Sequence, residues 1–472
     1  MSQKKFIRDI SASTIQIGVT QVANLLIFYL ISKYISKEEF GFYNWAVALS
    51  STIITVLSFG MDLVYVKRVA SEYKPLETIN LHFFHTLFSG IILIICALII
   101  SSFLPHLFQS NLLFLLILIN QVCFSIANSI KLCINGHERY NYLAYIAVSA
   151  NVLKISLILL LFFTHNFSLQ FIIYSFIFSY LTEFLMSYYL ANKIVQERIK
   201  PKVILSGYKE LITESLPQLG TVLFDSALAR IDWILMGILA TAVKTAEYSF
   251  TFKIFEISKL PYLILAPILL TRFSKLFKKD GDFKPEDGNK LDDFFKLEMF
   301  IAILIPVMAI TIWSDFFDWI TDNKYGRVNE LTYQLLAVCI PLHYATNFLW
   351  TMAFTQGQLK KIFLITAISS SLNICLNFVL IPVFGAEGAA LSFLVSTIIQ
   401  IILYQKMTLQ DKYRFKQSVL LTSITIGIIA ILSTRWLEIH TVFKLIFSVL
   451  IYILLSIFTG LFNIKTLKSI SI

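Results

Sequence analysis

Ionisable side chains lie inside long apolar stretches of this sequence, where a charge is costly and therefore informative. Lys154 occurs in the segment SANVLKISL, and Glu183 occurs in the next apolar segment. A charged residue at the centre of a membrane costs at least about 2.5–3.5 kcal/mol on insertion scales, so it normally faces a cavity or a partner. Lys154 therefore has two interpretations, which are a structural ion pair with Glu183 and a cationic contact with an anionic group of a substrate.

A second group of charges spans two consecutive apolar segments. The two segments are separated by a short gap at 241–246 and are expected to run antiparallel. The later charges of the first segment and the earlier charges of the second should then lie at comparable depths. They are expected to form a salt-bridged network, to line a water-filled cavity, or to do both. The group comprises Asp225, Arg230 and Asp232 in the first segment, and Lys253, Glu256 and Lys259 in the second.

A polar and aromatic stripe is expected on one later helix. His343, Asn347 and Trp350 recur at positions i, i+4 and i+7, which places them on one helical face. Such a face can contact sugar rings, and packing within the protein is an equal alternative.

Signals for metal, cofactor or covalent chemistry are weak. His82 and His85 lie one helical turn apart without a third ligand, so packing near a helix end is favoured over a metal site. Asp62 precedes a basic pair and is expected to fix a helix end. The five cysteines lack CxxC spacing, and the sequence contains no P-loop, GxSxG or HExxH motif. No cofactor, metal or catalytic residue is expected, and the enzyme interpretation is the weaker one.

The elements that carry these residues are fourteen apolar segments. Crossing a hydrocarbon core about 30 Å thick takes roughly 20 apolar residues per helix, and in lipid each segment must satisfy its own backbone hydrogen bonds. Hydrophobic residues make up 57% of the chain and charged residues 14%, against about 25% charged in soluble domains. An all-α polytopic membrane protein with about 14 transmembrane helices follows. The expected spans are 13–35, 42–66, 80–104, 111–135, 142–164, 168–191, 211–240, 247–271, 294–320, 330–356, 360–383, 387–408, 415–436 and 441–463.

The distribution of Lys and Arg predicts the topology. With the N-terminus in the cytoplasm, alternate gaps hold 28 of these residues on the inside and 7 on the outside. This bias follows the positive-inside rule, so both termini are expected in the cytoplasm. The net charge of +10 is thereby explained without a nucleic acid partner.

Internal similarity suggests two parallel six-helix repeats. The segment Asn135–Lys154, which opens helix five, resembles Gln356–Cys375, which opens helix eleven. Such repeats are common in transporters, with the substrate site between them. We expect an N-terminal lobe at 1–200, a C-terminal lobe at 201–410, and two appended helices at 411–472. The outer gaps are short, which disfavours a membrane glycan polymerase or ligase.

Three stretches resemble the Wzx-type polysaccharide-transport flippases of the MOP exporter superfamily. This superfamily also contains the MATE drug exporters and the lipid II flippases. The stretches are in the family's order and spacing, and the count of fourteen helices matches. They are Leu30–Ala70, with Gly41 and Tyr43 in its helix 1–2 turn; Leu228–Leu269, with Asp232, Gly237, Tyr248 and Pro267; and Asn377–Ser396, with its Leu-Ile-Pro and Gly-Ala-Ala elements.

The resemblance implies two six-helix lobes around a cavity that opens alternately to each side of the membrane. It also implies a substrate, an oligosaccharide on undecaprenyl diphosphate, which is moved to the outer leaflet of the bacterial plasma membrane for O-antigen, capsule or exopolysaccharide synthesis. Lys154, Arg230 and Lys253 would then contact the diphosphate. Membrane lipids, a polysaccharide polymerase and a chain-length regulator are the implied partners. The alternatives are a lipid II flippase or a cation-coupled multidrug exporter.

Overall fold

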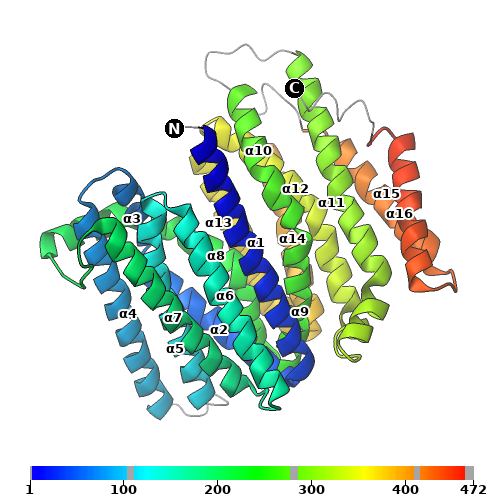
Figure 1. Cartoon of the computed structure of the whole chain (residues 1–472). Helices are drawn as coiled ribbons and strands as arrows, with labels where there is room; N and C mark the ends of the chain where they lie inside the picture. The colour runs from blue at the N-terminus through cyan, green and yellow to red at the C-terminus, as the bar shows by residue number, and fades with distance from the viewer. Residues whose placement is uncertain (1–2, 104–110, 277–284, 409–414, 463–472) are drawn as a thin grey trace. The chain divides into compact units, whose positions relative to one another are not determined.

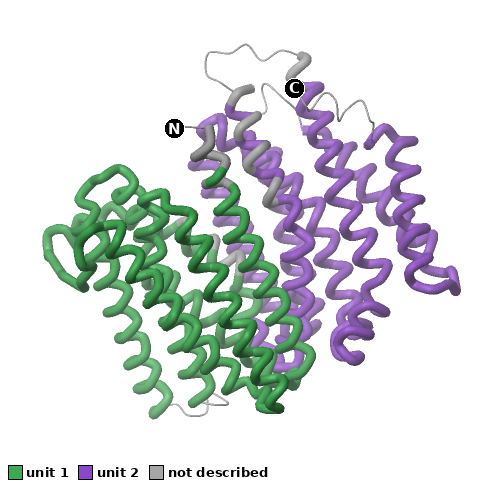
Figure 2. The backbone as a smooth tube through the Cα atoms, in the orientation of Figure 1, with its two compact units in different colours: residues 1–234 green, residues 235–472 purple. Residues whose placement is uncertain are grey.

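The computed structural model describes residues 3–103, 111–276, 285–408 and 415–462. Every regular element in these ranges is helical, as Figure 1 shows. The chain divides into two compact units, residues 1–234 and 235–472 (Figure 2). The boundary falls inside one long helix, which starts in the first unit and ends in the second.

The first unit is organised around α5. This helix contacts α2, α3, α4 and α7, while α6 lies between α1 and α7. The helices of this unit are α1 (Gln3–Tyr34), α2 (Lys37–Leu57), α3 (Met61–Ala70), α4 (Pro75–Phe103), α5 (Asn111–Gly136), α6 (Tyr140–Phe163), α7 (Leu169–Val195) and the larger part of α8 (Leu205–Leu239).

The second unit is organised around α12. Most of the residues of α12 are buried, and the helix contacts α9, α10, α11 and α14. The last two helices pack on α11 and on each other. The helices of this unit are α9 (Ala242–Ser258), α10 (Leu260–Leu276), α11 (Pro285–Ile320), the 3₁₀ turn η2 (Arg327–Asn329), α12 (Glu330–Thr355), α13 (Leu359–Phe384), α14 (Ala386–Met407), α15 (Gln417–Arg435) and α16 (Thr441–Phe458).

The predicted fold class is confirmed. Among the described residues, twelve helices are long and apolar enough to cross a membrane. They correspond to twelve of the fourteen expected spans, and the expected spans 211–240 and 247–271 fall on α8 and on α9 with α10. The protein is therefore a multi-pass membrane protein.

Two expected spans are not single helices, and here the sequence prediction needs correction. The span 42–66 breaks after Leu57, because Gly60 adopts φ +70° and α3 starts anew at Met61. A Cβ at Gly60 would come within 2.9 Å of the Gln218 side chain, so this turn requires glycine for both reasons. The span 247–271 breaks at Lys259, and Pro261 follows in the first turn of α10, where proline is tolerated.

Candidate functional site

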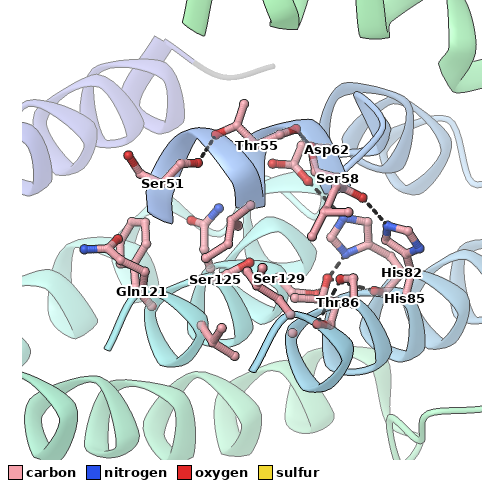
Figure 3. A pocket seen from close by; sticks show the side chains of 18 of the residues that line it. Ser51, Thr55, Ser58, Asp62, His82, His85, Thr86, Gln121, Ser125 and Ser129 are labelled. Carbon is pink, nitrogen blue, oxygen red and sulfur yellow. Dashed lines mark hydrogen bonds and ion pairs between the residues drawn. The ribbon is translucent and has the colours of Figure 1, made fainter. Parts of the chain in front are cut away.

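A polar cavity of about 360 Å³ lies inside the first unit, between α2, α3, α4, α5 and Val222 of α8. Hydroxyl groups of Ser51 and Thr55 come from α2, one turn apart on the same face. The amide of Gln121 and the hydroxyl of Ser125 repeat this spacing on α5 (Figure 3). Uncharged hydrogen-bonding groups therefore face the cavity from two helices.

The carboxylate in this cavity is oriented by a buried histidine. His82 of α4 lies with Nε2 3.0 Å from Oδ1 of Asp62 and with Nδ1 2.8 Å from Oγ of Ser129 (Figure 3). His82 is 3% exposed, whereas the Asp62 side chain is 45% exposed. In the neutral imidazole, Nε2–H donates to the carboxylate and Nδ1 accepts from the serine hydroxyl. Asp62 is thus fixed at one oxygen while part of its surface stays open to the cavity.

His85 closes the same end of the cavity. Its Nε2–H donates to the carbonyl oxygen of Leu57 at 2.7 Å, and its Nδ1 lies 2.8 Å from the hydroxyl of Tyr208. Leu57 is the last residue of α2, so His85 satisfies one carbonyl that the helix end leaves without an intrahelical partner. The packing interpretation of the two histidines agrees with these contacts.

An ion-pair cluster joins α3 to the first half of α8, which carries Val222 into the cavity wall. Arg68 is 4% exposed, and its guanidinium lies 2.7 Å from Glu214 and 3.1 Å from Glu210. Lys74 binds the other oxygen of Glu210 at 3.1 Å. The hydrogen bond from Lys74 and a second one from Tyr73 hold the pKa of Glu210 below its ordinary value. This cluster fixes the position of α8 within the first unit.

Lys154 and Glu183 do not pair with each other. The Glu183 carboxylate binds Lys131 of α5 at 2.7 Å. Lys154 is 7% exposed, and its Nζ lies 4.3 Å from the ring centroid of Tyr180 and 5.6 Å from that of Phe176. Among the described residues Lys154 has no ion pair. Of the two interpretations of Lys154, the ion pair with Glu183 is therefore wrong, and its ammonium group makes cation–π contacts with α7 instead.

The second predicted group of charges is divided by the unit boundary. Arg230 stacks its guanidinium 4.7 Å from the Trp233 ring, and the buried Asp232 accepts the Trp233 backbone N–H at 2.9 Å. The side chain of Asp225 lies outside the described part. In the second unit Lys253 binds Glu256 at 2.9 Å, one turn further along α9. A network that joins the two sides of this group stays a prediction.

Lys259 and His343 of the stripe on α12 lie against the same aromatic ring in the second unit. Nζ of Lys259 lies 4.3 Å from the Phe255 ring, and the His343 ring lies 5.8 Å from the same ring. Asn347 is buried one turn beyond His343, and Trp350 stacks on Phe354 at 4.9 Å. Nε2 of His343 and Nδ2 of Asn347 have no hydrogen-bond partner in the part of the chain that the structure describes. A sugar contact at this stripe stays a prediction.

Sequence reasoning missed most of the polar cavity. The sequence pattern that could have revealed the cavity is the repeat of polar residues at i, i+4 and i+7 within an apolar helix, as in Gln121, Ser125 and Asn128. Asp62 and His82 were identified in separate segments, without a contact between them. Only the turn at Gly60 brings α3 back against α4 and joins the two side chains.

Comparison with known proteins shows which family this chain matches. The family model described as "Polysaccharide biosynthesis protein" matches residues 6–273, which is more than half of the chain. A relative from Staphylococcus aureus, "Capsular polysaccharide biosynthesis protein CapF", is 20% identical over 400 residues, which cover 82% of this chain and 95% of that protein.

Solved structures share the fold. A lipid II flippase MurJ in an inward closed conformation superposes with a TM-score of 0.72 at 16% identity, covering 94% of this chain and 98% of that chain. An inward-facing MATE multidrug resistance transporter of the MOP superfamily gives 0.64 at 13% identity, covering 83% and 96%. The predicted resemblance to MOP-superfamily polysaccharide flippases is confirmed, and the chain belongs to the polysaccharide biosynthesis protein family.

Proposed function

We propose that this protein moves undecaprenyl-diphosphate-linked oligosaccharide repeat units from the inner to the outer leaflet of the bacterial plasma membrane by alternating access. The polar cavity of the first unit carries the proposal, because it lies in a membrane protein of a polysaccharide biosynthesis family. A sugar that leaves water needs replacements for the hydrogen bonds of its hydroxyl groups. The hydroxyl oxygens of Ser51 and Thr55 on α2 supply acceptors, because their protons are donated to backbone carbonyls of α2. Gln121 and Ser125 on α5 supply both donors and acceptors.

The size and charge of the cavity fit part of such a head group. Small-ligand sites enclose roughly 300–1,000 Å³, and this cavity of about 360 Å³ is at the lower end. Its one carboxylate among the described lining residues, Asp62, is a strong acceptor for a sugar hydroxyl. We therefore assign the cavity to a sugar unit, and we assign the diphosphate to cations elsewhere.

Lys154 is the cation that we favour for the diphosphate. Its ammonium group lies against aromatic faces instead of a carboxylate, so an incoming phosphate would not have to displace an acidic partner. Arg230 and Lys253 are further candidates, and Arg230 offers the bidentate geometry that suits phosphate. Both termini are proposed to be cytoplasmic. A polysaccharide polymerase and a chain-length regulator are the proposed partners.

Reconstitution tests the proposal directly. Purified protein in liposomes should move fluorescently labelled undecaprenyl-diphosphate oligosaccharide between leaflets, as measured by accessibility to an external glycosidase. Liposomes without protein and liposomes with an unrelated polytopic protein serve as controls. Equal rates in all three preparations would reject the proposed function.

Lipid II is the second candidate substrate, because the fold superposes on a lipid II flippase with a TM-score of 0.72. It shares the polyprenyl diphosphate and differs in its head group. Transport of lipid II without transport of an undecaprenyl-linked oligosaccharide would favour this candidate. Transport of cationic drugs without either lipid would favour an exporter.

A further inference from the structure

A buried carboxyl group with one unpartnered oxygen lies in the second unit. Glu298 of α11 is 1% exposed, and its Oε2 has no hydrogen-bond partner in the described part of the chain. Among the described residues Glu298 takes part in no ion pair. An unpaired carboxylate in a low-dielectric site is so costly that the group takes up a proton instead. An intramembrane acid of this kind marks a functional site by default.

The surroundings of Glu298 follow from the packing of α11 on α12. The rings of Phe295 and Phe348 lie 5.0 Å apart across this antiparallel pair. One turn further along α11 is Glu298, and one turn back along α12 is Tyr344, so the two side chains share a level. The buried Tyr344 hydroxyl likewise has no hydrogen-bond partner among the described residues. Two polar groups with unused hydrogen-bonding capacity thus lie at the same level of an apolar layer.

An aromatic cluster separates this level from the start of α11, which is the predicted cytoplasmic end. Phe348 lies 4.9 Å from Phe273 and 5.0 Å from Phe295, and Phe295 lies 4.8 Å from Phe415. These four rings are all buried. They come from α10, α11, α12 and the segment just before α15, so a shift of any one of these elements would open the cluster.

The other titratable groups nearby do not neutralise Glu298. Tyr262 of α10 packs on Tyr344 at 5.5 Å, and Tyr452 of α16 donates its hydroxyl to the Phe300 carbonyl at 2.8 Å. Two lysines near the start of α11 are engaged by aspartates. These pairs are Lys416 with Asp292 and Lys296 with Asp293.

We propose that Glu298 is the proton-binding site of the second unit, protonated behind the closed aromatic cluster and deprotonated to water when the cluster opens. In this step the carboxyl O–H bond breaks, the electron pair stays on Glu298, and the proton passes to water at the predicted cytoplasmic end. The proton-binding half of the inference is independent of the proposed function, and its coupling to transport rests on that function. With one proton coupled per cycle, a gradient of one pH unit shifts the substrate distribution about tenfold.

Infrared titration of the full chain in nanodiscs tests proton binding without any substrate. The wild type should show the carbonyl stretch of a protonated carboxylic acid, and Glu298→Gln should lack it. Glu438→Gln, which alters an exposed carboxyl group in the turn before α16, should retain the band. Gln has nearly the same shape as the protonated Glu, so normal abundance and melting temperature of the variant are expected. The same band in wild type and Glu298→Gln would overturn the inference.

Proteoliposomes with an imposed pH gradient test coupling. The gradient should change the distribution of undecaprenyl-linked oligosaccharide in the wild type and leave it unchanged in Glu298→Gln, while Glu298→Asp should restore part of the response. A wild type that transports the lipid equally with and without the gradient would overturn coupling but leave the proposed function intact. A response to a sodium gradient but not to a pH gradient would also overturn proton coupling, and would favour coupling to a metal cation. Loss of all lipid transport in the wild type would count against the proposed function, whereas the infrared band would still decide proton binding.

Discussion

The Glu183 carboxylate of α7 binds the Lys131 ammonium group of α5 at 2.7 Å, and this pair leaves Lys154 of α6 against aromatic rings. The two lysines therefore have different environments although both lie in helices that flank α7. Lys131 neutralises a buried carboxylate, whereas Lys154 is stabilised by the faces of Tyr180 and Phe176. Replacement of Lys131 and replacement of Lys154 should consequently have different effects on the protein.

Lys131→Ala should lower stability, because it strands the buried Glu183 carboxylate at a cost of about 3–5 kcal/mol. Lys154→Ala strands no carboxylate, so its abundance should stay near normal while glycan export falls strongly. Membrane abundance, melting temperature in detergent and surface polysaccharide would be measured for both. The double variant Lys131→Glu with Glu183→Lys should recover abundance. Equal loss of abundance in both single variants would contradict the separate roles.

Asp62→Asn should weaken sugar binding with little effect on the fold. The variant keeps the shape of the side chain, and its amide oxygen still accepts from His82. Loss of a charge-assisted hydrogen bond costs about 1.5–3 kcal/mol, or roughly 10–100-fold in affinity. Transport rate against substrate concentration in proteoliposomes would show this change. Asp322→Asn, which alters an exposed turn residue, is the matched control, and identical kinetics of the two variants would remove Asp62 from the site.

The helices were largely predictable because length and hydropathy are local properties of the sequence. The breaks within two of the expected spans were not predictable, since they depend on how distant parts of the chain pack. The turn at Gly60 is fixed by its close approach to Gln218, which lies far along the chain. At Lys259, the division between α9 and α10 was hidden because the residues that follow, Leu260 to Leu270, are all apolar and let the span continue.

The site was predictable only in part, because pairing depends on which helices are neighbours. Sequence reasoning identified Lys154 and Glu183 as unusual, and both are buried. It could not foresee that α5 would place Lys131 against Glu183. It also overlooked Glu298, since Asp292, Asp293 and Lys296 just before it made it look like part of the charged edge of a span.

The stability of the ion-pair cluster around Arg68 should depend on its contacts with both carboxylates, Glu210 and Glu214. Arg68→Lys cannot form the three contacts that the guanidinium makes with Glu210 and Glu214, because Lys has a single point charge. We expect a lower melting temperature for Arg68→Lys and a larger decrease for Arg68→Ala. Lys67→Ala removes only an exposed partner of Glu214 and should have little effect. A decrease for Lys67→Ala as large as that for Arg68→Ala would show that net charge, not the buried guanidinium, stabilises the cluster.

Acid should weaken the contact between Lys74 and Glu210. A carboxyl group whose pKa is lowered in the folded state contributes stability above its unfolded pKa, and this contribution is lost as pH falls through the folded pKa. The pKa of Glu210 is lowered by its hydrogen bonds from Lys74 and Tyr73. The pKa of Lys74 is raised by Glu210, so the contribution of Lys74 is lost only as pH rises through its own folded pKa.

The melting temperature of Lys74→Gln should therefore lie below that of the wild type at neutral pH, and the difference should shrink as Glu210 is protonated. Lys360→Gln, on an exposed position of α13, controls for the change in net charge. A difference that stays constant through the acidic range would show that Glu210 is not the group that Lys74 stabilises.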